Sequence, residues 1–246
     1  MHFTALGVGD AFSAKYYSSC LLIEHEGEKI LFDCPHPIRK ILKESRPEVD
    51  LNDIRATVIT HLHADHSSGV EGLGFFYYFA LKRHAILIGH NKVLSELWSK
   101  LSSSMSVLHI DHGMRLHGDY SYFQYEKIVE GQITAPLRVD PMKFTFECRR
   151  TIHHIPTYAW KIHAGGKTLA LSADTAYDPK LIEWLDDGSD LIVHETNLGT
   201  HTPYEKLLQL PQRIKDKMYL IHYTDEFDCN ASEIKCLKQG MSYTVG

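Results

Sequence analysis

Cysteine is scarce in this sequence, and its placement argues against a disulfide framework. The 246 residues contain five cysteines, an odd number, and no two of them form a C-x-x-C pair. Folds that depend on disulfides carry closely spaced, paired cysteines, so this pattern favours a reducing compartment. The opening residues lack the positive start and apolar core of a signal peptide, and no apolar run reaches the length of a membrane span. We therefore expect a cytoplasmic protein without a membrane partner.

Basic residues are also in deficit. Lysine and arginine total 26 against 31 acidic residues, which leaves a formal net charge of −5. A chain with this balance has no overall positive field to attract a polyanion, so a long nucleic-acid partner is not expected. The residue in excess is histidine, with 17 copies.

Apolar segments with the spacing of strands alternate along the chain with segments of helical spacing. The segments expected as strands are 2–8, the hairpin 19–34, 56–60, 85–89, 143–155, 158–165, 167–174, 190–195 and 218–223. The segments expected as helices are 36–45, part of 67–83, 92–101, 179–187 and one near 231–239. We predict a single α/β domain over residues 1–246, an αββα sandwich of two mixed β-sheets flanked by helices. Composition alone does not separate this fold from other α/β layers.

The segment "TVITHLHADHSSGVEGL" (57–73) places four potential metal ligands directly after a buried strand. These are His61, His63, Asp65 and His66. The first two share one face of an extended backbone, whereas the last two follow where the chain turns into a helix. Two adjacent sites explain this spacing better than one, and neutral imidazole and carboxylate suit zinc and similar divalent ions. The alternative is a plain helix start with Asp65 as its cap.

The H-x-H-x-D-H pattern resembles the motif of the metallo-β-lactamase-fold hydrolase superfamily. Three later segments resemble that family's pattern in the same order: "TIHHIPTYAWKI" (151–162), "LALSADT" (169–175) and "YLIHY" (219–223). The resemblance implies three further ligands, namely His153 rather than its neighbour His154, Asp174 and His222. Ala173 stands where the family usually has glycine.

The resemblance also implies how the ligands divide between two divalent ions, with zinc expected and manganese as the alternative. One ion would take His61, His63 and His153, and the other would take Asp65, His66 and His222. Asp174 and a hydroxide would bridge them, and Asp33 would orient a ligand histidine from behind. Taken singly, each later residue has a plainer interpretation: a polar strand pair for His153 and His154, turn residues for Asp174 and Asp33, and a core histidine for His222.

The segment "DLIVHETN" (190–197) resembles the "HEAT" segment of ribonuclease Z and related cyclic phosphodiesterases. The resemblance implies that His194 is the general acid that protonates the leaving oxygen of a phosphodiester. Glu195 would orient it, and Asp65 would act with them as a catalytic residue. The alternative is a histidine at a strand end beside a surface glutamate.

The interval between the third histidine and the bridging aspartate bears on the substrate. Ribonuclease Z enzymes typically insert a long tRNA-gripping arm there, but only 21 positions separate His153 from Asp174. The short interval instead resembles two small-substrate enzymes, the phosphoribosyl cyclic phosphodiesterase and the anti-Pycsar cyclic-nucleotide phosphodiesterases. The first tends to carry an extra cysteine-rich zinc site, and the sequence shows no such cluster near its N-terminus, so we favour the resemblance to the second. This implies hydrolysis of 3′,5′-cyclic mononucleotides to linear monophosphates, a homodimer, and a location in the cytoplasm, or in the host cytoplasm if a phage encodes the chain. The alternatives are an RNA 3′-end endonuclease, a phosphoribosyl cyclic phosphodiesterase and a non-phosphate hydrolase.

Two groups of tyrosines are candidates for the substrate pocket. Tyr120, Tyr122 and Tyr125 lie in the irregular segment 102–143, which we interpret either as an aromatic strand at a sheet edge or as a lid or dimer contact over a nucleobase. Tyr16 and Tyr17 are expected either to line the pocket or to cover the edge of the core. Aromatic faces stack on bases with little preference among them.

Overall fold

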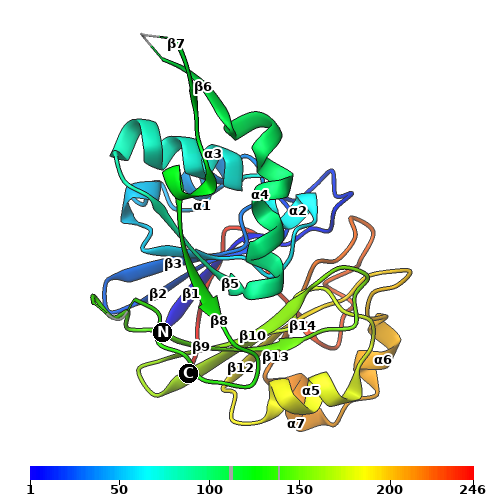
Figure 1. Ribbon diagram of the computed structural model, residues 1–246. Helices are drawn as coiled ribbons and strands as arrows, with labels where there is room; N and C mark the ends of the chain where they lie inside the picture. Colours follow the sequence, from blue (N-terminus) through cyan, green and yellow to red (C-terminus); the bar gives the residue numbers. More distant parts are fainter. Residues whose placement is uncertain (111–112, 138) are drawn as a thin grey trace.

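Two mixed β-sheets pack face to face, and helices cover their outer sides (Figure 1). The structure is a computed structural model that describes residues 1–110, 113–137 and 139–246. The arrangement is the predicted αββα sandwich, so the prediction of fold class is confirmed.

The first sheet has seven strands in the order β15-β1-β2-β3-β4-β5-β8. Their bounds are β1 His2–Gly7, β2 Cys20–His25, β3 Glu28–Phe32, β4 Ala56–Val58, β5 Ala85–His90, β8 Phe123–Ile128 and β15 Ser242–Thr244. Strands β2 and β3 form the predicted hairpin, and its turn places Glu26 and Gly27 at positive φ. Strands β3, β4, β5 and β8 run parallel, so their carboxyl ends lie at one edge of the sheet.

The second sheet has six strands in the order β14-β13-β12-β11-β10-β9. Their bounds are β9 Thr145–Arg150, β10 Tyr158–Ala164, β11 Lys167–Leu171, β12 Leu191–Glu195, β13 Met218–Ile221 and β14 Lys235–Cys236. Strands β11, β12 and β13 are parallel. Loops at the carboxyl ends of parallel strands are the usual place for functional groups in α/β folds.

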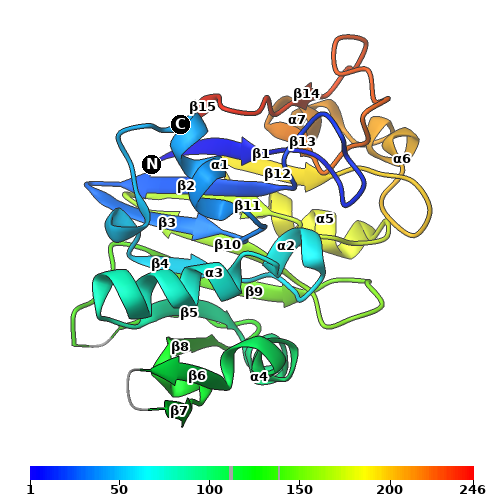
Figure 2. The same ribbon diagram turned by 90° about the horizontal axis from the view of Figure 1, so that it is seen from above.

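The helices form the two outer layers (Figures 1 and 2). On the first sheet lie α1 Ile38–Ser45, α2 Ala64–Ser67, α3 Val70–Phe75, its π-helical continuation Phe76–Leu81 and α4 Asn91–Met105. On the second lie α5 Pro179–Asp186, α6 Tyr204–Leu208 and α7 Gln212–Asp216. Single-turn helices cover Leu51–Asp53 and Asp119–Ser121. Helix α5 starts at residue 179, as expected. The side chain of Asp178 accepts a hydrogen bond from the backbone N–H of Lys180, and Pro179 occupies the first turn.

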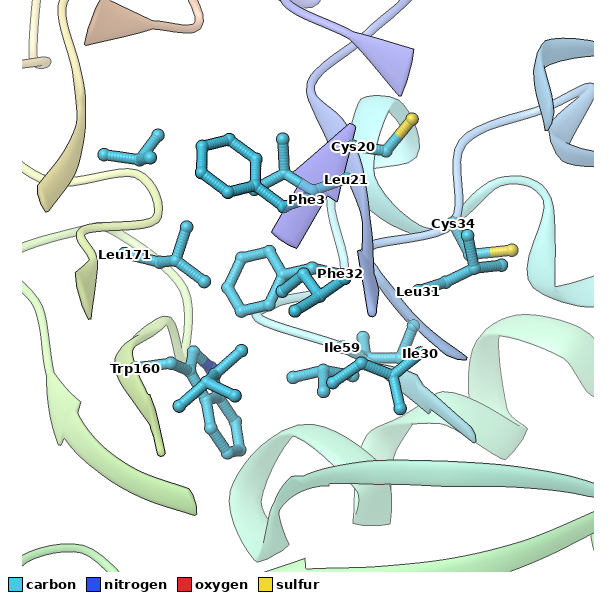
Figure 3. Packing of buried hydrophobic residues seen from close by; sticks show 14 of the residues in the cluster. Phe3, Cys20, Leu21, Ile30, Leu31, Phe32, Cys34, Ile59, Trp160 and Leu171 are labelled. Atoms are coloured by element: carbon cyan, nitrogen blue, oxygen red, sulfur yellow. The ribbon is translucent and has the colours of Figure 1, made fainter. Parts of the chain in front are cut away.

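The core lies between the inner faces of the two sheets. Figure 3 shows Phe3 and Phe32 of the first sheet directed toward Leu171 and Trp160 of the second. The neighbouring Leu31 points the other way, toward the helices, as strand alternation requires. Phe3 and Trp160 are fully buried. This packing holds the two sheets, and hence the loops at their edges, in one fixed relation.

Two parts of the chain differ from the sequence-based expectation. The prediction of a helix near 231–239 is wrong. This segment contains the short strand β14, and the backbone N–H of Leu237 donates a hydrogen bond to the carbonyl of Leu220 at 2.9 Å. Strands β6 Val107–Ile110 and β7 Gly113–Leu116 form a two-stranded hairpin that was not predicted. It projects beyond the helices that cover the first sheet (Figure 1). Among the described residues, no helix combines the length and the apolar character that crossing a membrane requires.

Candidate metal centre

The loop that follows β4 is held in place by hydrogen bonds before any metal is considered. The backbone N–H of Thr60 donates to Asp33 Oδ1 at 2.9 Å, and the hydroxyl of Ser67 donates to the carbonyl of His63 at 2.8 Å. From helix α4, Lys100 Nζ donates to the carbonyl of Leu62 at 2.6 Å. The ligand-type side chains of this loop therefore project from a rigid support.

A first group of ligand atoms gathers where this loop meets the second sheet. Its members are His61, His63, His153 and Asp174. His61 Nε2 lies 3.1 Å from His63 Nδ1 and 3.5 Å from Asp174 Oδ2. His153 Nε2 lies 3.2 Å from His63 Nδ1. The sequence prediction placed the same residues together.

A second group stands beside the first and shares Asp174 with it. Its members are Asp65, His66, Asp174 and His222. Asp65 Oδ2 lies 3.2 Å from both His66 Nε2 and His222 Nε2. Asp174 turns Oδ1 toward this group, at 3.3 Å from His66 Nε2, and Oδ2 toward the first group. One carboxylate thus faces both groups, which is the position of a bridging ligand.

These residues fit a pair of divalent ions. Metal–ligand bonds of about 2.1 Å at tetrahedral angles put neighbouring ligand atoms about 3.4 Å apart, close to the separations found here. Among the described residues, the buried His66 Nε2 has no hydrogen-bond partner although it points at two carboxylates. Burial lowers the pKa of His61 to about 3 and that of His153 to about 4, which keeps both imidazoles neutral and able to bind a metal.

Asp33 lies behind the second group, where the sequence predicted it. Its Oδ2 accepts hydrogen bonds from His66 Nδ1 at 2.8 Å and from the hydroxyl of Thr60 at 2.9 Å. A histidine that donates from Nδ1 presents the lone pair of Nε2 to the ligand cluster. Asp33 therefore sets both the orientation and the tautomer of His66.

Three residues of the centre have left-handed backbone conformations. Asp33 has φ 63°, Ala173 has φ 50° and His222 has φ 61°. Ala173 is the alanine that stands where the family usually has glycine, and a Cβ in this conformation costs roughly 1 kcal/mol or more. The turn at Ala173 directs the next side chain, Asp174, between the two groups of ligands.

The side chain of His194 points away from this centre, so the position predicted for it is wrong. His194 is fully buried, and its Nδ1 donates to the carbonyl of Glu195 at 2.7 Å. Burial lowers its pKa to about 4. Neighbouring residues of a strand point to opposite faces, and on β12 it is Glu195 that faces the ligands. A buried side chain on the far face of β12 does not reach the two groups of ligand atoms.

His201, which sequence reasoning missed, lies at the centre instead. Its Nδ1 donates to Glu195 Oε1 at 3.0 Å, and its ring stacks on that of His222 with centroids 5.3 Å apart. Glu195 Oε1 also accepts the backbone N–H of Thr175 at 2.8 Å, which fixes the carboxylate. Polar atoms of Glu195, His201 and His222 lie within 4.8 Å of one another.

The candidate pocket tyrosines are mostly placed elsewhere. Tyr122 is fully buried and donates to the carbonyl of Met105 at 2.9 Å, so its assignment to a pocket is wrong. Tyr17 donates to Glu44 at 2.7 Å, and Tyr16 packs edge-on against Tyr223, which fits the alternative that they cover the core edge.

Segment 102–143 supplies the edge strand β8 of the first sheet, with residues 111–112 and 138 outside the described part. Tyr120 is exposed on the single-turn helix Asp119–Ser121 before that strand, and Tyr125 is half-buried on the strand itself. The interpretation as an aromatic edge strand therefore holds for β8, and a contact of these two tyrosines with substrate stays a prediction.

Comparison with known proteins identifies the family to which the chain belongs. A family model described as anti-Pycsar protein Apyc1 matches residues 1–243. The chain belongs to the anti-Pycsar protein Apyc1 family. A family protein from Saccharibacillus brassicae is 28% identical over 262 residues, with all of both chains covered. One from Bacillus phage vB_BveM-Goe7 is 28% identical, with 96% of this chain and 95% of the relative covered.

More distant similarities extend beyond the Apyc1 family. The cGMP-dependent 3′,5′-cGMP phosphodiesterase A of Dictyostelium discoideum is 24% identical across 98% of this chain and 28% of its own length. The metallo-β-lactamase fold protein YhfI from Bacillus subtilis superposes with a TM-score of 0.75 at 19% identity, covering 99% of each chain. The short form of human tRNase Z gives 0.71 at 20% identity, covering both chains fully. The predicted family is thus confirmed, and so is the coarser prediction of a metal-dependent hydrolase.

Proposed function

We propose that this protein hydrolyses 3′,5′-cyclic mononucleotides to linear monophosphates. The observation that carries the proposal is the pair of ligand groups joined by Asp174, with the Glu195–His201 pair beside them. The names of the family relatives and of the Dictyostelium phosphodiesterase support a cyclic-nucleotide substrate. We propose zinc as the metal, with manganese as the alternative, held by the seven ligands described above.

Hydrolysis of a phosphodiester would depend on the bound metals for some steps and on residues of this chain for others. Two bound divalent ions lower the pKa of water and neutralise charge on phosphate oxygens. The chain supplies the arrangement: Asp174 faces both ligand groups, and Asp33 keeps His66 in one tautomer. The leaving oxygen of the ring must still receive a proton, and a residue of this chain has to hold it.

We propose His201 as that proton donor, in the role that the sequence assigned to His194. Burial alone would lower the pKa of His201, but the hydrogen bond to Glu195 and the charges of Glu195, Asp174 and Asp65 outweigh it and raise this pKa. In the protonated imidazolium of His201, Nδ1 donates to Glu195 and Nε2 carries the second proton, which is the one that can be transferred.

The test compares His201→Gln with His194→Gln as the matched control. On a cyclic mononucleotide, His201→Gln should lower kcat on the order of a hundredfold while the metal content is unchanged. On bis-p-nitrophenyl phosphate the loss should be much smaller, because p-nitrophenolate leaves without a proton. His194→Gln should leave the ratio between the two substrates unaltered. Equal losses on both substrates in His201→Gln would show that His201 positions the site and is not the acid.

The choice of substrate is tested by a hydrolysis screen. Strands β10 and β11 fill the interval between His153 and Asp174, so that interval contains no arm for gripping tRNA. We expect cyclic mononucleotides to be opened, with a weak dependence on salt because few phosphates are engaged. Efficient cleavage of pre-tRNA, with cyclic mononucleotides ignored, would replace this proposal with a ribonuclease.

The remaining predictions concern the state of the chain. We propose that residues 1–246 act as one hydrolase domain, since both sheets supply metal ligands. A homodimer and a cytoplasmic location stay predictions. The exposed side chains of Met114 and Leu116 on the β6–β7 hairpin are the first to replace if light scattering finds a dimer.

A further inference from the structure

A cleft opens beside the metal centre and shares two of its histidines. Its volume is about 470 Å³, and His201 and His222 form part of its wall. The rest of the wall comes from three loops, which follow β1, β12 and β13. Clefts of this size hold small molecules. A molecule with its phosphate at the metals would extend along this cleft.

Two large apolar side chains in the wall of this cleft are exposed. Phe12, on the loop after β1, is 91% exposed, and Leu198, on the loop after β12, is 77% exposed. Single exposed apolar residues are common and need no explanation. Here, however, two of them come from separate loops and line the same cleft as the histidines of the metal centre.

A continuous chain of hydrogen bonds connects the backbones of these two residues. The N–H of Phe12 donates to Asp10 Oδ1 at 3.0 Å, and Asn197 Nδ2 donates to Asp10 Oδ2 at 3.1 Å. The N–H of Leu198 donates to Asn197 Oδ1 at 2.7 Å. Asn197 Nδ2 also donates to the carbonyl of His222 at 3.1 Å, which ties the pair to a metal ligand.

The loop after β13 is hydrogen-bonded to the loop after β1, which carries Phe12. Asp225 accepts hydrogen bonds from the hydroxyl of Ser13 and from the backbone N–H groups of Ala14 and Lys15. Asp10 is itself buried. The backbone under Phe12 is therefore held from both sides although the side chain is exposed. A contact surface that is fixed before the ligand arrives loses little entropy on binding.

We propose that Phe12 and Leu198 form the subsite for the base of a nucleotide whose phosphate lies at the metal centre. The inference rests on the proposed function and deepens it, because it names the residues that recognise the substrate. A phenyl ring stacks on any base through its face, and a leucine side chain covers apolar surface beside it. The subsite thus favours nucleotides over sugar phosphates without a strict choice among bases.

The test measures binding and not turnover. Calorimetry with the metal-loaded protein gives the Kd of guanosine 5′-monophosphate and that of ribose 5-phosphate, which lacks the base. The Kd of ribose 5-phosphate divided by that of guanosine 5′-monophosphate reports the contribution of the base and cancels effects on the phosphate site. We expect Phe12→Ala to reduce this ratio by about 5- to 150-fold, the range that stacking of one base represents. Leu198→Ala should reduce it at least about threefold.

The matched control is Phe79→Ala, because Phe79 is half-exposed on the π-helix and does not line this cleft. Its ratio should equal that of the wild type. Two results would overturn the proposal of a base subsite. One is equal Kd values for the two ligands in the wild-type protein, and the other is a ratio of Kd values that is unchanged in both Phe12→Ala and Leu198→Ala. Failure of the proposed function is seen separately, as a lack of cyclic-nucleotide hydrolysis by a protein that still prefers the nucleotide to the sugar phosphate.

Discussion

Replacing Asp33 with asparagine tests how the protein fixes a metal ligand from behind. Both oxygens of Asp33 accept hydrogen bonds: Oδ1 from the backbone of Thr60, and Oδ2 from His66 and the Thr60 hydroxyl. Asparagine keeps only one of these acceptors and turns the other into a donor. Whichever way the amide is turned, its NH₂ group therefore faces either the backbone N–H of Thr60 or Nδ1 of His66.

The expected size of the effect follows from this mismatch. The backbone N–H of Thr60 cannot change, so the NH₂ group will face His66, which can respond only by moving its proton from Nδ1 to Nε2. Nε2 is the atom that lies 3.2 Å from Asp65 and 3.3 Å from Asp174, where the metal is expected. Disturbing such an outer partner typically weakens metal binding 10- to 100-fold, or about 1.4–2.7 kcal/mol. The loss should fall mainly on the group that contains Asp65, His66 and His222.

The assay is a titration of the metal-loaded protein with a chelator, with released metal measured at each step. Asp33→Asn should release one ion at a lower chelator concentration than the wild type, while the second ion is released almost as before. Asp190→Asn is the control, because Asp190 also accepts hydrogen bonds from a backbone N–H and from a side chain, but at the opposite end of β12. Unchanged release of both ions from Asp33→Asn would refute the role given to Asp33.

Three further outcomes are expected. Asp174→Ala should lose metal from both groups, whereas His222→Ala should empty mainly one, and metal analysis that finds both ions retained without Asp174 would contradict the bridge. Ala173→Gly should raise the free energy of unfolding by about 0.5–1 kcal/mol, because glycine adopts its left-handed conformation freely; denaturant melts at saturating metal measure this, and a loss of stability would count against backbone strain at that turn. Trp160→Ala should lower the free energy of unfolding by about 3–5 kcal/mol, since this fully buried side chain fills the space between the sheets, and a cost below 1 kcal/mol would mean that the core closes over the cavity.

The candidate metal ligands were predictable to different degrees because they lie at different distances along the chain. The cluster from His61 to His66 is local, so its residue types and spacing suffice to suggest two adjacent sites. His153, Asp174 and His222 come together only because the second sheet brings the ends of its strands to the same edge as β4. Spacing alone does not predict that meeting, and these three rested on the family resemblance.

The proposed proton donor, His201, was missed because a resemblance between segments does not say which side chain faces inward. The strand β12 ends in His194 and Glu195, and strand alternation lets only one of them reach the centre. A buried carboxylate there needs a partner, and the next histidine in the sequence, His201, is within reach on the following loop. Tyr122 was misplaced for a similar reason, since an aromatic residue in an irregular segment shows no periodicity that distinguishes core from pocket.

The division of the ligands between the two sheets has a consequence during synthesis of the chain. His61 leaves the ribosome roughly 160 residues before His222. At about 5–20 residues per second, the first ligands wait on the order of 10–30 s for the last one. Throughout that interval the nascent chain offers an incomplete, open chelator to every metal in the cell. Both candidate ligand groups are therefore complete only when the second sheet has folded against the first, because each group includes residues from both sheets.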